Sequence, residues 1–451
     1  ALYWVFPYFE GELNSPALVV FLLLCLFHVV RTWPLGIALW RAALAGLLLG
    51  ALTLVRPEAL LFVPLVVVWG AWVAFFGKTT SKTACAEDAA DKTRQWAGKE
   101  CSLQGAAPRD RRATAWRGGA ALALCVLAFA ACIAPVTLRN YRASGEFVLI
   151  TQGAGVNLYA GNNPHADGIY PDVNMAEPLG VARLMNNNDF PDYLDALQKK
   201  LGREDLGYAD LSAYFSQLAW EYIKTHPWRT AKLMGKKALL YWGPAEVSNN
   251  KVHYYDKQRS PTLRYLPGFP WVAALFATGL LLWLIDCRRR RAGGPRKVRS
   301  TKPLVRSAGF GPYETATRPY ARKCALQNHR DEARAVALLM LGVLAIHFAA
   351  VLPLFMAARY RVTIIPILFL FGGYGVARIV GMCRTGALRQ AVVALGAAAC
   401  LVGVAHVEWV PYTPPKDVWH LTRAQAYDLK DQTVEAAEEL EQAVEAGGDR
   451  P

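Results

Sequence analysis

Residues 118–136 read GGAALALCVLAFAACIAPV, a stretch that contains no charged side chain. About 20 apolar residues form a helix long enough to cross the roughly 30 Å hydrocarbon core of a bilayer. The stretch is preceded by Arg111, Arg112 and Arg117, and Arg139 follows it closely. An uncharged segment of this length between basic residues predicts a helix that spans a membrane.

Further stretches of the same kind indicate a chain that crosses the membrane repeatedly. They are residues 13–30, 35–55, 59–76, 267–285, 333–356, 362–380 and 391–407. Apolar residues make up 54% of the 451 residues, and charged residues make up only 19%, below the usual quarter. This composition excludes a simple soluble enzyme and a disordered protein. We therefore predict an all-α polytopic membrane protein with about eight spans and substantial polar loops.

The position of the basic residues predicts how the chain is oriented. A net charge of +15 would suit a nucleic-acid-binding protein, but the Lys and Arg residues gather in the loops 77–117 and 286–332 and again in 384–389. Cytoplasmic loops carry such an excess, so we predict these loops inside and no nucleic-acid partner. The segment 139–265 and the tail after residue 407 then lie outside. Both are free of cysteine, as expected on an oxidising side.

Four regions follow from this alternation. Residues 1–138 hold spans one to four, residues 139–265 form an external domain, residues 266–410 hold spans five to eight, and residues 416–451 form a tail.

Arginines occur in the short external connections, where the same rule expects few. Arg56 and Glu58 lie between the second and third stretches, Arg139 at the end of the fourth, and Arg359 and Arg361 between the sixth and seventh. Each arginine can anchor a helix end at the headgroups, or its guanidinium can bind a lipid-linked phosphate. Both alternatives stay open for any single cluster. The recurrence of three clusters on one side favours a convergent site for an anionic group.

The external segment begins with a glycine- and asparagine-rich region. Residues 147–151 (FVLIT) are a strand-like run, and residues 153–164 read GAGVNLYAGNNP. The pattern lacks the third glycine and the following helix of a dinucleotide-binding fingerprint. We therefore predict a loop of tight turns that suits a hydroxyl-rich ligand or shapes the chain. No His or Cys spacing in the sequence predicts a metal site.

Four blocks carry patterns that are more specific together than singly. They are the turn Arg56-Pro57-Glu58; the segment Arg139-Asn140-Tyr141…Gly145-Glu146-Phe147 with the loop Asn157-Leu158-Tyr159-Ala160-Gly161-Asn162-Asn163-Pro164; the segment Lys237…Tyr241-Trp242…Glu246…Asn249-Asn250; and Arg359-Tyr360-Arg361…Pro366. In this order and spacing the chain resembles bacterial membrane glycosyltransferases of the protein O-mannosyltransferase-like group (glycosyltransferase family 39, GT-C superfamily). The resemblance covers nearly the whole chain.

The resemblance implies a fold, an activity and a location. The fold would be a GT-C-like transmembrane bundle with a mostly helical external domain, in the bacterial inner membrane. The enzyme would take a sugar from a polyprenyl-phosphate donor and transfer it, with inversion, to an acceptor protein, lipid or glycan on the outer face. No cofactor beyond this donor is implied. The matched motifs imply these substrate-binding residues: Arg56, Glu58, Arg139, Asn140, Asn162, Asn163, Lys237, Glu246, Arg359, Tyr360 and Arg361.

The catalytic residue itself is unknown. In the family it is an acidic residue of the first external loop, and no residue here matches that motif, which we attribute to missing N-terminal spans. Glu10 and Glu12 are acidic and predicted to be external, but nothing else marks them as a catalytic base.

Two helices are predicted in the external segment. Apolar residues recur every three or four positions in 206–224, which predicts a helix, and His226-Pro227 ends it. Residues 228–242 are amphipathic, basic and end in Tyr241-Trp242, a composition typical of helices that lie in the membrane interface among lipids. Lys237 is rotated about 100° from Lys236, so we expect Lys237 to face the site and Lys236 the headgroups.

The tail resembles one tetratricopeptide repeat. Ala424, Tyr427, Ala436 and Ala443 have the spacing of its helix-packing positions. A protein partner that binds this helical hairpin is therefore possible.

The sequence is compatible with three functions. A glycosyltransferase is favoured. A lipid or glycan transporter would use the same cationic mouth but would need inverted repeats or broken helices, which the sequence does not show. A non-catalytic membrane scaffold that presents the tail would not need the external arginines.

Overall fold

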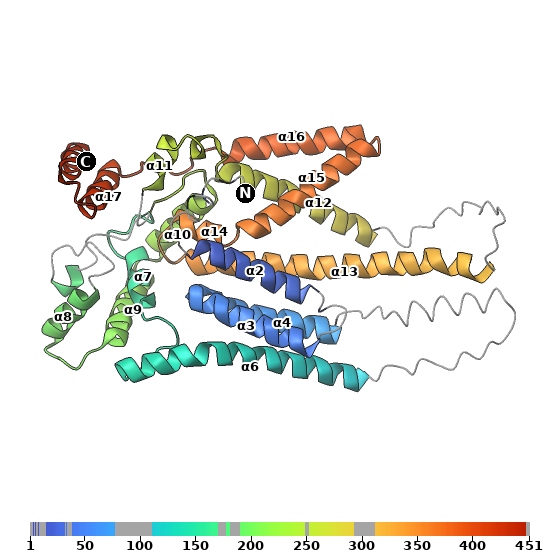
Figure 1. Ribbon diagram of the computed structural model, residues 1–451, viewed down its shortest axis with the longest axis horizontal. Coiled ribbons are helices and arrows are strands. Elements are labelled where there is room, and N and C mark those ends of the chain that lie inside the picture. Colours follow the sequence, from blue (N-terminus) through green and yellow to red (C-terminus); the bar gives the residue numbers. More distant parts are fainter. Residues whose placement is uncertain are drawn as a thin grey trace. The chain divides into compact units, whose positions relative to one another are not determined.

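The computed structural model describes residues 3, 5, 8, 15–31, 33, 38–76, 111–169, 177–180, 190–248, 252–292 and 312–447. Most of the basic loop 77–117, part of the loop 286–332, Glu10, Glu12 and the pair Asn249-Asn250 lie outside these residues. Every regular element in the described part is a helix, as Figure 1 shows. The main helices are α2 (Pro16–Val30), α3 (Leu39–Val55), α4 (Phe62–Ala71), α6 (Arg111–Ser144), α7 (Ala154–Gly161), α8 (Phe190–Leu201), α9 (Tyr208–Thr225), α10 (Pro227–Trp242), α11 (His253–Arg259), α12 (Phe269–Ala292), α13 (Pro312–Val351), α14 (Ala358–Val362), α15 (Ile365–Arg384), α16 (Leu388–Ala405), α17 (Lys416–Asp428) and α18 (Thr433–Gly447).

The described residues contain 6 helical segments that are long and apolar enough to cross a membrane, judged by length and composition. They are Pro57–Ala74, Trp116–Ser144, Leu263–Arg289, Glu332–Val351, Ile365–Arg384 and Leu388–Ala405. The first two predicted spans correspond to α2 and α3, with 15 and 17 residues. At 1.5 Å per residue these helices are only about 22 and 26 Å long. The described part of the chain is therefore helical with six candidate spans, and eight spans stay a prediction.

The chain divides into two compact units. Unit 1 comprises Ala1–Val20, Asn140–Arg288 and Phe348–Pro451, and unit 2 comprises Phe21–Arg139 and Arg289–His347. The predicted external segment 139–265 and the tail belong to unit 1, apart from Arg139.

Small residues bring the helices of unit 2 close together. A Cβ atom on Gly46 of α3 would lie 2.1 Å from the carbonyl oxygen of Cys125 in α6, and one on Gly50 would lie 2.5 Å from the Cβ of Cys132. Packing through small residues is common between membrane helices, because close backbone approach maximises dispersion contacts. The indole of Trp69 in α4 donates a hydrogen bond of 2.8 Å to the carbonyl of Ala335 in α13.

In unit 1, glycines likewise bring the candidate spans α12 and α15 close together. A Cβ on Gly279 would lie 1.8 Å from the carbonyl oxygen of Phe371, and the Cα of Gly279 is 2.9 Å from a Cβ placed on Gly375. Nearer the end of α12, Arg378 donates two hydrogen bonds to Asp286, of 2.7 and 2.9 Å. These contacts fix how α12 and α15 pair.

The helices between residues 139 and 265 match two predictions and correct two others. The helices α9 and α10 confirm the predicted helices and the break at His226-Pro227. Residues 147–151 are irregular rather than a strand, because their carbonyls accept side-chain hydrogen bonds from Asn140. Residues 154–161 form the helix α7 instead of a loop. Gly155 lies against α9, where its Cβ would be 1.8 Å from the carbonyl oxygen of Ser212. This glycine serves helix packing rather than a turn.

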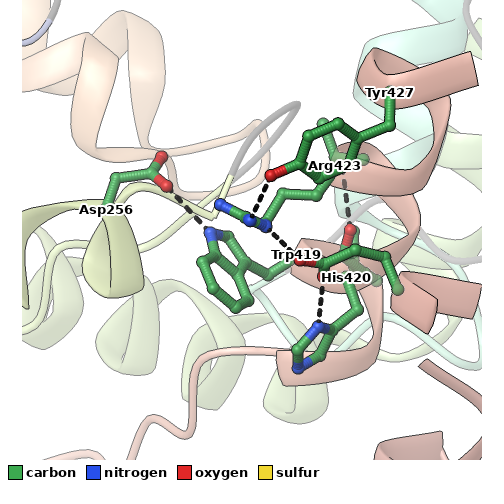
Figure 2. Close-up of polar contacts among 8 residues, drawn as sticks. Asp256, Trp419, His420, Arg423 and Tyr427 are labelled. Carbon is green, nitrogen blue, oxygen red and sulfur yellow. Dashed lines mark hydrogen bonds and ion pairs between the residues drawn. The ribbon is translucent and has the colours of Figure 1, made fainter. Parts of the chain in front are cut away.

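The tail contains the helices α17 and α18, which pack against each other as a hairpin. Glu439 of α18 is buried. The Nδ1 of His420 lies 2.7 Å from one of its oxygens, and Arg423 donates to the other at 2.7 Å. Figure 2 shows His420 and Arg423 on α17. The indole of Trp419 donates a hydrogen bond of 2.8 Å to Asp256 of α11. The hairpin is thus held to α11 in unit 1.

Candidate functional site

Arg361 lies in the short helix α14 and is buried, with only 2% of its side chain exposed. Its Nη2 donates hydrogen bonds to the carbonyls of Leu240 and Ala245, at 2.5 and 2.6 Å. Its Nη1 lies 3.5 Å from the Oε2 of Glu246, and its guanidinium carbon lies 4.4 Å from the ring centre of Phe269. The guanidinium therefore joins α14 to the C-terminal end of α10 and to the segment that follows.

Glu246 is the acidic partner of Arg361 and is buried with it. Its Oε1 accepts a hydrogen bond of 2.7 Å from the hydroxyl of Tyr3. Burial raises the pKa of Glu246, while Arg361 and Tyr3 oppose the rise because both stabilise the carboxylate. We call Tyr3, Glu246 and Arg361 the Arg361 cluster.

A second buried group surrounds Lys237 of α10. Its Nζ donates hydrogen bonds to the carbonyls of Gly161 and Pro353, at 2.8 and 3.3 Å. Burial lowers the pKa of Lys237 to about 7, and Asp167 opposes this shift. The side-chain amide of Asn162 also donates to the carbonyl of Pro353, at 2.7 Å. We call Asn162, Lys237 and Pro353 the Lys237 cluster.

Asn163 stabilises the same region from within. Its amide nitrogen donates to the carbonyl of Tyr159 at 3.0 Å, and its amide oxygen accepts the backbone N–H of His165 at 2.8 Å. The asparagines of the GNNP motif are therefore held to the backbone, and they end α7 in a fixed conformation.

Residues 352–358, which follow α13, connect the two clusters; we call them the crossing segment. The carbonyl of Pro353 belongs to the Lys237 cluster, and the N–H of Met356 donates to the carbonyl of Gly168 at 3.0 Å. The N–H of Ala358 donates to the carbonyl of Val247 at 2.8 Å. A Cβ on Gly161 would lie 2.7 Å from the oxygen of Pro353, so only glycine permits this approach.

Arg359 has different surroundings from Arg361, two residues away. Its side chain is only partly buried, and its guanidinium carbon lies 5.5 Å from the ring centre of Tyr360. Within the described part of the chain, its Nε has no hydrogen-bond partner. Tyr360 in turn is buried and its ring lies 6.1 Å from that of Phe355. Among the described residues, Arg361 pairs with Glu246, and no acidic group is found to pair with Arg359.

The structure places the remaining predicted site residues as follows. Asn140 donates to the carbonyls of Val148 and Ile150, at 3.3 and 3.1 Å, and so shapes the chain after α6. Arg56 and Glu58 form an ion pair of 3.7 Å in unit 2, and Arg139 is exposed on α6 in the same unit. Convergence of these three residues with Arg359 and Arg361 stays a prediction.

Sequence reasoning missed several residues of these clusters. Tyr3 and Pro353 carry no pattern that marks them. Outside the two clusters, the pair of Asp286 and Arg378 was also missed. A signal for this pair was present in the sequence, because opposite charges at the ends of two apolar stretches predict a pair. Their bidentate contact, to which the hydroxyl of Tyr374 adds a hydrogen bond of 2.5 Å, pairs α12 with α15.

No group of three His, Cys, Asp or Glu side chains in the described ranges is arranged to hold a metal ion. No protein-family model matches the chain, and comparison with curated proteins and with solved structures finds no match. Fold and site therefore define a helical protein with six candidate membrane spans and two buried polar clusters in unit 1.

Proposed function

We propose that the protein is a membrane glycosyltransferase that moves a sugar from a polyprenyl-phosphate donor to an acceptor protein, lipid or glycan on the outer face of the membrane. The resemblance of four sequence blocks to such enzymes is the basis of the proposal. The six apolar helices support it, because a lipid-linked donor requires an enzyme within the bilayer.

The observation that carries the proposal is that three of these blocks meet in unit 1. The GNNP loop, the segment of Lys237 and Glu246, and the RYR motif are joined through the crossing segment and the two clusters. Buried ion pairs contribute little to stability, since well-packed apolar residues in their place are often as stable or more so. The buried Lys237, Glu246 and Arg361 therefore favour a framework that holds a functional geometry over a passive scaffold.

In this framework the residues have separate roles. Arg361, Glu246, Lys237, Asn162 and Asn163 are positioning residues, because their polar atoms bind other parts of the chain. Arg359 is the residue we assign to the donor phosphate, because its side chain is only partly buried and its Nε, an atom that is itself buried, lacks a hydrogen-bond partner in the described residues. Guanidinium groups bind phosphate through charge-assisted hydrogen bonds.

Binding of polyprenyl phosphate, compared with uncharged polyprenol of the same length, tests this assignment. The full-length protein in nanodiscs should bind the phosphate form more tightly. Since a hydrogen bond to a charged group contributes about 1.5–3 kcal/mol, Arg359→Ala should weaken binding of the phosphate about ten- to a hundredfold and leave polyprenol binding unchanged. Arg389→Ala, an exposed arginine of α16, is the matched control.

Equal affinity of the wild-type protein for the two lipids would overturn the proposal and favour the scaffold. A protein that prefers the phosphate but never transfers a sugar from membrane lipid extracts to acceptors in the same membranes would instead favour the transporter.

A further inference from the structure

The outward face of α10 combines exposed aromatic, aliphatic and basic side chains. Trp228 is 72% exposed and Leu239 is 46% exposed. Lys232 lies between them on the exposed side, with its Nζ 5.6 Å from the ring centre of Trp228. Residues 228, 232, 235 and 239 are spaced by four, three and four positions, so they form one stripe along the helix.

The opposite face of α10 is fixed inside unit 1. Leu233, Lys237, Leu240 and Tyr241 are all buried, and Lys237 is bound through its Nζ to two carbonyls. The helix therefore cannot rotate to bury Trp228 and Leu239 against its own unit.

The C-terminal end of α10 packs on a candidate span. The ring of Trp242 stacks on that of Phe276 in α12, with 6.1 Å between the ring centres, and the centre of the Phe269 ring lies 6.2 Å away. The start of the same span carries a second exposed aromatic residue, Tyr265, which is 76% exposed and lies 4.6 Å from the guanidinium carbon of Arg264. Pairs of an exposed aromatic ring and a cation thus occur near the start of α10 and just before α12.

The charge of α10 indicates the chemistry of its occupant. Besides the buried Lys237, the helix contains Arg229, Lys232 and Lys236, and it contains no acidic residue. Aromatic rings with an adjacent cation suit the headgroup region, where the apolar body enters the acyl boundary and the charge meets lipid phosphate. We propose that the stripe Trp228–Lys232–Leu239 lies on the anionic surface of the bilayer that contains α12.

The reactivity of Lys232 towards a water-soluble acylating reagent tests this proposal in the unmodified protein. Labelling is measured by mass spectrometry in a neutral detergent, in phosphatidylcholine nanodiscs and in nanodiscs rich in phosphatidylglycerol. We expect Lys232 to be protected roughly fivefold in the anionic nanodiscs relative to detergent, and less so in phosphatidylcholine or at high salt. Lys430, an exposed residue of the tail between Asp428 and Asp431, is the control and should label equally in all settings.

A double variant, Trp228→Ala with Leu239→Ala, removes the apolar anchor without touching the buried face. It should restore labelling of Lys232 in the nanodiscs. Equal labelling in all three settings would overturn the proposal. Protection already complete in detergent would also overturn it, because protein rather than lipid would then cover the stripe. These readouts do not depend on transfer activity, so they stand or fall separately from the proposed enzyme.

Discussion

Arg359 and Arg361 show how little a motif says about the surroundings of each residue in it. Both arginines belong to one short helix, but Arg361 is enclosed by two carbonyls and Glu246, while Arg359 keeps its Nε without a partner in the described residues. The sequence predicts the same task for both, because it shows two guanidinium groups beside a membrane. The difference arises because the carbonyls of Leu240 and Ala245 and the carboxylate of Glu246 surround only one of them.

The same limit applies to Lys237. Its rotation away from Lys236 is predictable from the helical period, and the structure has Lys237 buried and Lys236 partly exposed. What Lys237 faces is not predictable, because its partners are backbone carbonyls of Gly161 and Pro353. Every residue has a carbonyl, so no sequence pattern marks these two.

Lys237 should make the stability of unit 1 depend on pH. Its pKa is lowered to about 7 in the folded protein, mainly by burial, against about 10.4 in an unfolded chain. Between these values the unfolded state binds the proton and the folded state does not, so the free energy of unfolding rises with pH. The contribution of Lys237 to the free energy of unfolding is fully present above the pKa of the unfolded chain, and it is lost as the pH falls through about 7.

Thermal unfolding in detergent from pH 7 to pH 10 measures this effect. As the pH rises, the unfolding temperature of the wild type should increase relative to that of Lys237→Met. Lys236→Met, which alters a partly exposed lysine, should follow the wild type. A constant difference between the wild type and Lys237→Met across this range would contradict the lowered pKa.

At the scale of elements, hydropathy predicts more than local pattern does. Each of the eight apolar stretches contains a helix, because in a bilayer the backbone satisfies its hydrogen bonds most simply within one segment. The errors fall between the fourth and fifth apolar stretches, at residues 147–151 and in α7. There the conformation is decided by the hydrogen bonds of Asn140 and by the contact of Gly155 with α9. Both contacts join residues that are too far apart in the sequence for the spacing of apolar residues to predict them.

The pairing of α12 with α15 should depend on Gly279 far more than on Gly373. A Cβ at Gly279 would lie 1.8 Å from a backbone oxygen of Phe371, whereas one at Gly373 would meet nothing within 4 Å. Gly279→Ala should therefore force the helices apart and cost about 1–3 kcal/mol, typical of overpacking. Gly373→Ala should be neutral or slightly stabilising, since alanine favours helix. The unfolding temperatures of both variants in detergent check this, and equal values would refute the close contact.

At the scale of a whole unit, Trp419 links the helical hairpin of the tail to α11. Its indole donates a hydrogen bond to Asp256, and its ring lies 5.3 Å from the ring of Tyr255, with the guanidinium carbon of Arg259 at 4.4 Å from its centre. The alanine spacing predicts helices in this part of the chain, and the structure has α17 and α18 there. Its attachment was not, because Trp419 and Asp256 are distant in sequence and neither belongs to a motif.

Trp419→Ala should release the hairpin from α11. Faster amide hydrogen exchange in residues 253–259 and easier proteolysis before Lys416 are the expected results, because α11 loses both the indole hydrogen bond and its ring contacts. Trp409→Ala, at an exposed tryptophan outside the hairpin, is the control. Unchanged exchange in α11 after Trp419→Ala would show that other contacts hold the tail.

The crossing segment also sets an order of events during synthesis. Pro353 is made 191 residues after Asn162 and 116 residues after Lys237, and its carbonyl is a partner of both. At 5–20 residues per second, the second interval alone lasts roughly 6–23 s. Through that time the Lys237 cluster lacks one of its members, so α7 and α10 are synthesised before their packing can be completed. The fold of unit 1 is therefore completed only after the crossing segment has been synthesised, which makes this short stretch the last requirement for a cluster whose other members are made much earlier.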